Sequence, residues 1–114
     1  MISLRKRLSV ATLALSLLAV SLVVAAPNIN GLYPPAVQRG QGEVRVTLGG
    51  NQLTDPQDIV FYEPGIELVE LEAQADNRIT AVLRISKDCP LGQVPLRVCT
   101  ARGVSNMKQL GITA

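Results

Sequence analysis

The residue types that most enzymes use for acid–base or nucleophilic chemistry are scarce in this sequence, and histidine is absent from all 114 residues. Without histidine, Cys–His pairs, Ser–His–Asp triads and the usual histidine-bearing zinc sites are excluded. Beyond residue 26 the only serines are Ser86 and Ser105, and neither lies in the Gly-x-Ser-x-Gly pattern of a nucleophile elbow. Any catalytic mechanism would therefore depend on carboxylates.

Four glutamates lie close together in the sequence, at Glu63, Glu67, Glu70 and Glu72. On an extended strand, Glu70 and Glu72 would share one face at a separation of about 7 Å. A glycosidase pair or a cation site could use such carboxylates. A solvated acidic edge that discourages sheets from aggregating is the favoured alternative. An enzyme that depends on this cluster is therefore the least favoured of the functions considered.

A second oxygen-rich segment contains Asn51, Asp55 and Asp58. As ligands for Ca²⁺ these residues are few and irregularly spaced, so hydrogen-bonded turns around Pro56 are the favoured interpretation. The sequence therefore predicts no metal-binding, cofactor-binding or catalytic residues.

The glycine pairs and the aromatic residues also indicate no ligand-binding site. Gly40-Gln41-Gly42 and Gly49-Gly50 are not full Gly-x-Gly-x-x-Gly runs that open a helix, so we expect turns rather than a phosphate cradle. The aromatic residues are Phe61, Tyr33 and Tyr62, with no tryptophan, so the core must depend on Val, Ile and Leu. We expect both tyrosines to be packed, which leaves too few exposed rings for a sugar-stacking platform.

The two cysteines, Cys89 and Cys99, allow a disulfide outside the cytoplasm. Cys89 falls in a predicted turn and Cys99 in the strand that follows, which could place them about 20 Å apart if that strand begins near Gln93. A disulfide needs Cα atoms within about 7 Å. Two unpaired, partly buried thiols are the alternative to a bond.

The first 25 residues have the composition of a secretory signal peptide. A cationic segment at Arg5-Lys6-Arg7 precedes the apolar run from Leu8 to Val24, and small residues follow. We expect cleavage after Ala25, with Ala26 as the second choice. An uncleaved membrane anchor is the alternative, because the run is close to the length that begins to span a bilayer.

Removal of this segment changes the net charge. Three of the eleven basic residues lie in it and all nine acidic residues lie beyond it, which leaves eight basic residues and a net charge of −1. The basic surface that drives nucleic-acid binding is therefore missing, and no nucleic-acid partner is expected. A membrane contact is expected only transiently through the signal peptide, or through the uncleaved anchor.

From residue 27 to residue 114, short apolar-periodic runs alternate with turn residues, which predicts one all-β domain of about seven strands. The clearest alternation is in 43–48, with Val44, Val46 and Leu48 inward, and in 78–86, with Ile79, Ala81, Leu83 and Ile85 inward. Val94, Leu96 and Val98 form a further inward face, and Leu110 and Ile112 are the expected anchors of a last strand over 105–113.

Three segments depart from simple alternation. The consecutive apolar residues of Asp58 to Tyr62 predict a strand that is covered on both faces or central in its sheet. In 66–73 the apolar face switches, which suggests a bulge, and Pro64-Gly65 before it fits a type II turn. Pro95 lacks a donor and should lie at a strand start or an open edge.

The order of these signals resembles the immunoglobulin-like domains known as IPT/TIG. The opening motifs carry the resemblance, namely Pro27-Asn28-Ile29, Leu32-Tyr33-Pro34-Pro35, Gln38-Arg39-Gly40 and the segment from Val44 to Leu53. The closing segments from Gly92 to Leu96 and from Thr100 to Asn106 are similar to the last strands of that family. Together with Val60 to Ile66, the chain looks most like the version near the N-terminus of exported bacterial proteins, where it precedes pre-peptidase C-terminal (PPC) domains.

The sequence therefore predicts an immunoglobulin-like β-sandwich of the IPT/TIG type at 27–114, preceded by an N-terminal signal helix within 1–25. The resemblance and the lack of catalytic groups favour a non-enzymatic structural or interaction module of an exported bacterial protein, acting through protein–protein or domain–domain contacts. The alternative is a module that binds carbohydrate or another cell-surface polymer. Either would be secreted, periplasmic or at the cell surface.

Overall fold

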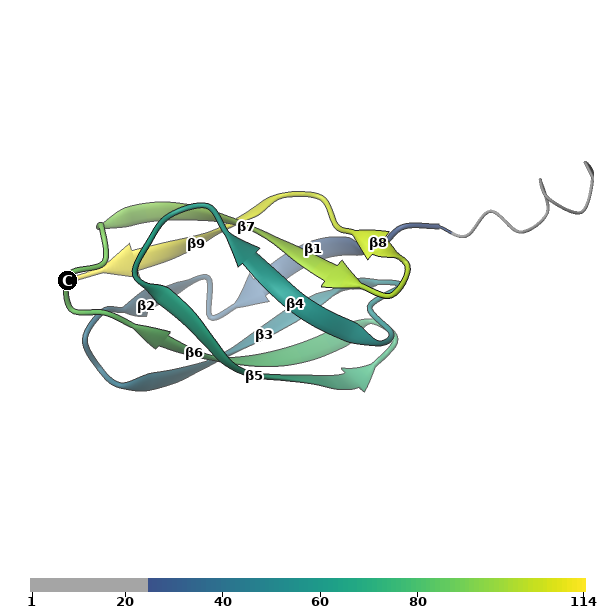
Figure 1. Cartoon of the computed structure of the whole chain (residues 1–114), viewed down its shortest axis with the longest axis horizontal. Coiled ribbons are helices and arrows are strands. Elements are labelled where there is room, and N and C mark those ends of the chain that lie inside the picture. Colours follow the sequence, from purple (N-terminus) through teal and green to yellow (C-terminus); the bar gives the residue numbers. More distant parts are fainter. Residues whose placement is uncertain (1–24) are drawn as a thin grey trace, which may run out of the picture.

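The computed structural model describes residues 25–114, and within them every regular element is a β-strand. The strands form two sheets that pack face to face (Figure 1). The all-β sandwich predicted from the turn spacing is confirmed. The expected signal peptide and its helix lie outside the described residues, except for Ala25. In residues 25–114 no helix is long and apolar enough to cross a membrane.

The first sheet has four antiparallel strands. Their order is β1 (Asn28–Tyr33), β3 (Glu43–Asn51), β6 (Arg78–Ile85) and β5 (Ile66–Ala75). Where the pairing is regular, the strands alternate between the core and water, because successive side chains point to opposite faces. The inward residues predicted in β3 and β6 are confirmed, and Val46, Leu48, Ile79 and Leu83 are at most 2% exposed.

The second sheet contains the remaining strands. Its order is β2 (Ala36–Gln38), β9 (Lys108–Thr113), β7 (Gly92–Thr100) and β4 (Pro56–Phe61), with β8 (Gly103–Val104) also paired to β7. β2 runs parallel to β9 and the other pairs are antiparallel. β2 and β8 are the two strands that the sequence did not predict. Strands of two or three residues are too short to show a period in the apolar residues.

Pro34 and Pro35 mark the point where the chain leaves the first sheet for the second. β1 ends at Tyr33 and pairs with β3, whereas β2 begins at Ala36 and pairs with β9. Proline has no backbone donor, so two prolines in succession end the pairing of β1. The carbonyl of Pro35 already accepts a hydrogen bond from the Gly111 N–H at 2.9 Å, which begins the pairing with the second sheet.

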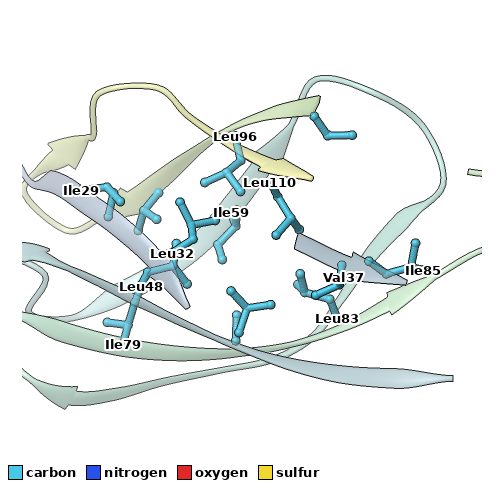
Figure 2. Packing of buried hydrophobic residues seen from close by; sticks show 14 of the residues in the cluster. Ile29, Leu32, Val37, Leu48, Ile59, Ile79, Leu83, Ile85, Leu96 and Leu110 are labelled. Carbon is cyan, nitrogen blue, oxygen red and sulfur yellow. The ribbon is translucent and has the colours of Figure 1, made fainter. Parts of the chain in front are cut away.

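One continuous core lies between the sheets and consists almost entirely of aliphatic side chains (Figure 2). Ile29 and Leu48 from the first sheet meet Ile59, Leu96 and Leu110 from the second (Figure 2). Phe61 is partly buried and packs against this cluster. The expectation that packing depends on Val, Ile and Leu is confirmed, as are the inward positions of Val94, Leu96, Val98, Leu110 and Ile112.

β4 departs from its prediction. The consecutive apolar residues at 59–62 suggested a strand covered on both faces or central in its sheet, but β4 lies at an edge, and Val60 is 37% exposed while Ile59 is 5% exposed. The prediction was wrong because an apolar run does not record which neighbours the strand acquires. Only one face of β4 meets the core.

The irregular positions were predicted more accurately. The register of β5 against β6 shifts between Leu68 and Glu70, where the bulge was expected. Gly65 has a φ of 100°, as the predicted turn requires. The expectation that Pro95 lies at a strand start or an open edge was wrong, because it lies within β7, which has β9 and β4 as neighbours. Its carbonyl accepts a hydrogen bond from the N–H of Tyr62, the residue just after β4. The nitrogen and the carbonyl of one strand residue point to the same side. The N–H donor that Pro95 lacks would therefore point to a place where β4 has already ended.

Candidate functional site

The solvent-facing side of the four-stranded sheet carries a row of polar side chains that runs across all its strands. Tyr33 of β1 lies opposite Thr47 of β3, Thr47 opposite Thr80 of β6, and Thr80 opposite Glu72 of β5. Directly opposed residues of antiparallel strands share one face, so these four side chains are neighbours on the outer surface. The row begins with an aromatic ring and continues over two small threonines.

An open hollow of about 640 Å³ lies over Tyr33, Thr47 and Thr80 of this row. Its floor consists of small residues, Gly31, Gly49 and Gly50 with Thr47 and Thr80. Its rim consists of the larger polar residues and the aromatic ring, Asn30, Tyr33, Gln74, Asn77 and Arg78. The volume is in the range of small-molecule sites, but the hollow is a depression on a sheet face rather than an enclosed cavity.

Tyr33 is 65% exposed and Tyr62 is 51% exposed. The prediction that both tyrosines are packed was therefore wrong. Tyr33 faces outward because it lies opposite Thr47 on the outer face of the sheet, while its neighbour Leu32 faces the core. Its ring lies over the backbone of its own strand, because a Cβ atom at Gly31 would lie 3.1 Å from the Tyr33 hydroxyl oxygen and 3.3 Å from Cζ.

The opposite rim comes from the turn between β5 and β6. Asn77 lies in this turn, and its carbonyl accepts a hydrogen bond of 3.0 Å from the Gly50 N–H of β3, which ties the turn to the floor. Arg78 begins β6 and Gln74 lies at the second irregularity of β5, between Ala73 and Ala75. The rim therefore combines amide groups with one guanidinium, and all of them can donate hydrogen bonds.

Arg78 is the only charged residue among those that line the hollow. Within residues 25–114, both ion pairs belong to Arg84 instead. Its Nη2 atom lies 3.0 Å from Glu43 Oε1, and its Nη1 atom lies 3.1 Å from Glu67 Oε2. The guanidinium of Arg78 is therefore available to a ligand.

No family model matches this chain. A search of curated proteins also gives no match. Among solved structures, the chain is similar to SGBP-B from a complex xyloglucan utilization locus in Bacteroides uniformis, with a TM-score of 0.50 and 17% sequence identity over 75% of this chain. The match covers 22% of that protein. At this identity the likeness concerns the fold alone.

Of the glutamates weighed as a catalytic or cation site, Glu67, Glu70 and Glu72 are spread along β5 and Glu63 precedes it. Glu70 and Glu72 lie opposite Val82 and Thr80, so they share the outer face as predicted. Glu67 pairs with Arg84, and the four glutamates do not converge on a point, because no group of three or more potential metal ligands occurs among residues 25–114. β5 is an edge strand of the first sheet, so Glu67, Glu70 and Glu72 lie along a sheet edge.

The second oxygen-rich segment forms local hydrogen bonds. The Asp58 side chain accepts a bond of 2.8 Å from the Ile59 N–H, and Asp55 has a positive φ of 58° in the turn before β4. Gly40 and Gly42 have φ values of 74° and 81°, as expected of turns. Gly49 and Gly50 are different: they lie inside β3, so the turn predicted there was wrong.

The cysteine thiols and the Ser105 hydroxyl are further nucleophilic groups that the sequence analysis considered. Cys89 and Cys99 are both free. Burial raises the pKa of the Cys89 thiol, which keeps the sulfur protonated and a poor nucleophile. The hydroxyl of Ser105, which is 1% exposed, accepts a bond from the Val98 N–H and donates one to the Asn106 carbonyl, each at 2.8 Å. The Ser105 hydroxyl therefore satisfies two backbone groups.

The hollow is the arrangement that sequence reasoning missed. Its residues come from 30–33, 47–50 and 74–80, and only strand pairing brings these segments together. One signal was available. Gly31 and Tyr33 are two residues apart, and on a strand this spacing places them on the same face.

Proposed function

We propose that this protein is a non-enzymatic interaction module that works outside the cytoplasm and contacts its partner through the outer face of the four-stranded sheet. The observation that carries the proposal is the hollow over Thr47 and Thr80, which combines an exposed aromatic ring with side-chain donors and acceptors. Its lining residues include no carboxylate or thiol that could form a general acid and base pair. Such a surface is suited to binding rather than to bond cleavage.

The location follows from the N-terminal residues. We propose that residues 1–25 are a secretory signal and that the domain over 27–114 belongs to the IPT/TIG type found in exported bacterial proteins. The two-sheet sandwich of residues 28–113 is compatible with that family. The protein would then be secreted, periplasmic or at the cell surface, where a polymer is an accessible partner.

Among partners, a carbohydrate or other surface polymer is favoured by the exposure of Tyr33. An aromatic ring that presents a free face can stack on the C–H groups of a sugar, because the face of the ring carries negative charge density. The similarity to a protein from a xyloglucan utilization locus supports the same choice.

A protein partner is the second candidate, and a different surface favours it. On the outer side of the second sheet, Val60, Tyr62 and Val104 are 37%, 51% and 52% exposed. Exposed apolar groups on one face are typical of protein–protein contacts. The two candidates therefore use opposite sides of the sandwich.

Affinity electrophoresis of the purified protein in gels that contain xyloglucan, other soluble β-glucans or mannans tests the carbohydrate proposal. We expect at least one polysaccharide to retard the protein and the retardation to be lost in Tyr33→Ala. Tyr62→Ala is the matched control, because it removes an exposed tyrosine from the other sheet and should leave the retardation unchanged.

Three results would contradict the proposal. Retardation by none of the polysaccharides would remove the carbohydrate function, and loss of a captured protein partner in Tyr62→Ala would favour the second candidate. Release of reducing ends from a bound polysaccharide by the purified protein, retained after Tyr33→Phe, would show that the module is an enzyme.

A further inference from the structure

The ring of Tyr33 lies down on the sheet instead of standing away from it. A Cβ atom at Gly31 would come within 3.1 to 3.5 Å of three atoms of this side chain, and one at Gly49 on the next strand would lie 3.9 Å from Cε2. The ring therefore rests on the two glycines of the outer face, one on β1 and one on β3. Because Tyr33 is still 65% exposed, its opposite face is open to water.

A purely structural role for this ring must be considered. Aromatic side chains can shield the backbone of glycines in edge strands, and β1 is an edge strand. Shielding requires only the ring and the glycine. It does not require the amides and the guanidinium that form the opposite rim of the same hollow.

We infer that the free face of Tyr33 stacks on a pyranose ring within an uncharged polysaccharide chain, and that Gln74, Asn77 and Arg78 hydrogen-bond the neighbouring part of that chain. The inference rests on the proposed function and specifies its ligand. β1 and β6 are separated by β3, so the two sides of the site are about 10 Å apart. An open site of that width suits internal units of a chain better than a single terminal sugar.

The charges of the surrounding face favour an uncharged ligand. Four carboxylates, from Glu43, Glu67, Glu70 and Glu72, lie on this face with three guanidinium groups, from Arg45, Arg78 and Arg84. Arg84 is already paired with two of the carboxylates. The remaining balance is not positive, so the face does not attract a polyanion such as a polyuronate.

Gly31 is a positioning residue in this arrangement, because it allows the ring to lie flat without contacting the ligand through a side chain of its own. Gly31→Ala places a methyl carbon 3.1 Å from the Tyr33 hydroxyl oxygen, so the flexible ring must shift by a few tenths of an ångström. The variant therefore displaces the ring slightly while the tyrosine itself is kept. A role limited to covering the backbone predicts no effect of this change on binding.

The test uses the full-length protein and isothermal titration with soluble oligosaccharides of a neutral β-glucan or mannan, beside oligogalacturonate as the anionic probe. We expect Tyr33→Ala to weaken binding of the neutral oligosaccharide about tenfold, the effect of one lost stacking contact. Gly31→Ala should weaken it by a smaller factor, and Tyr62→Ala should not change it. Thermal unfolding of each variant checks that the fold is kept.

A spectroscopic signal separates stacking from shielding. The protein has two tyrosines and no tryptophan, so the fluorescence of a Tyr62→Phe variant reports on Tyr33 alone. Stacking predicts that the neutral oligosaccharide changes this fluorescence and that Gly31→Ala reduces the change.

The outcomes distinguish the inference from the proposed function. If the unmodified protein binds none of the oligosaccharides, the carbohydrate function itself fails. If it binds a neutral oligosaccharide with equal affinity in Tyr33→Ala and Gly31→Ala, the function stands and the inference about the site is overturned. Preferential, salt-sensitive binding of oligogalacturonate would overturn the inference of an uncharged ligand.

Discussion

The two faces of the four-stranded sheet consist of the same strands but of different chemistry. The inner face presents Leu48, Ile79 and Leu83, all at most 2% exposed, whereas the outer face presents glycines, threonines and paired charges. The period of two residues in a strand allows this division, since each face is specified by alternate positions. The inner face therefore contributes most to stability through burial of apolar groups, and packing constrains the outer face less.

Gly49 and Gly50 provide the sharpest test of this difference, because they are adjacent but face opposite ways. A Cβ atom at Gly50 would lie 1.8 Å from the Asn28 carbonyl oxygen, whereas one at Gly49 has no neighbour closer than 3.9 Å. We expect Gly50→Ala to lower the free energy of unfolding by about 3 kcal/mol or more, because backbone must move. Gly49→Ala should change it by about 0.5 kcal/mol or less.

Urea unfolding of both variants measures these differences. Similar losses for the two variants would contradict the division of the sheet into a structural face and a tolerant face.

The inner face is the part of the molecule that the sequence predicted well. Alternation in 43–48 and 78–86 identified the buried apolar residues of β3 and β6, because each of these strands has one face on the core along its length. The same logic failed for β4, where an apolar run of four residues contains Val60 and Tyr62, which are exposed. Edge or centre is a property of strand order, and periodicity does not contain it.

The outer hollow was not predicted for a related reason. Its residues have no pattern along the chain, since Tyr33, Thr47 and Thr80 become neighbours only through the registers of β1, β3 and β6. A preference of aromatic side chains for burial then led to the wrong environment for Tyr33. The contacts that form the hollow join residues far apart in the sequence, and local propensity does not determine them.

Asn106 lies in the loop between β8 and β9 of the second sheet and bonds to β1 of the first sheet. Its side-chain amide accepts a bond of 2.7 Å from the Ile29 N–H and donates one of 3.0 Å to the Ile29 carbonyl, as a neighbouring strand would. Asn106→Ala leaves both backbone groups of Ile29 without these partners, and we expect a loss of about 1.5 kcal/mol in the free energy of unfolding. Thermal or urea unfolding measures it.

Met107→Ala is the control for this change, because Met107 is the next residue and is 42% exposed. It should unfold almost as the unmodified protein does. Equal stabilities of Asn106→Ala and Met107→Ala would mean that the two hydrogen bonds add nothing to the joining of the sheets.

The smallest effect is expected on the outer face, at Arg84. Its guanidinium lies between Glu43 and Glu67, but the side chains in both pairs are at least 51% exposed, so water and salt screen the attraction. We expect Arg84→Gln to lower the free energy of unfolding by about 0.5 kcal/mol at low ionic strength. The difference should shrink further in about 1 M salt, where the Debye length is about 3 Å.

Arg78→Gln is the control, since Arg78 lies on the same strand and face without an ion pair and should show no salt-dependent difference. A loss at Arg84 that is large and independent of salt would mean that the outer face supports the fold as strongly as the core does, and a surface under that constraint would have little freedom to be shaped for a ligand.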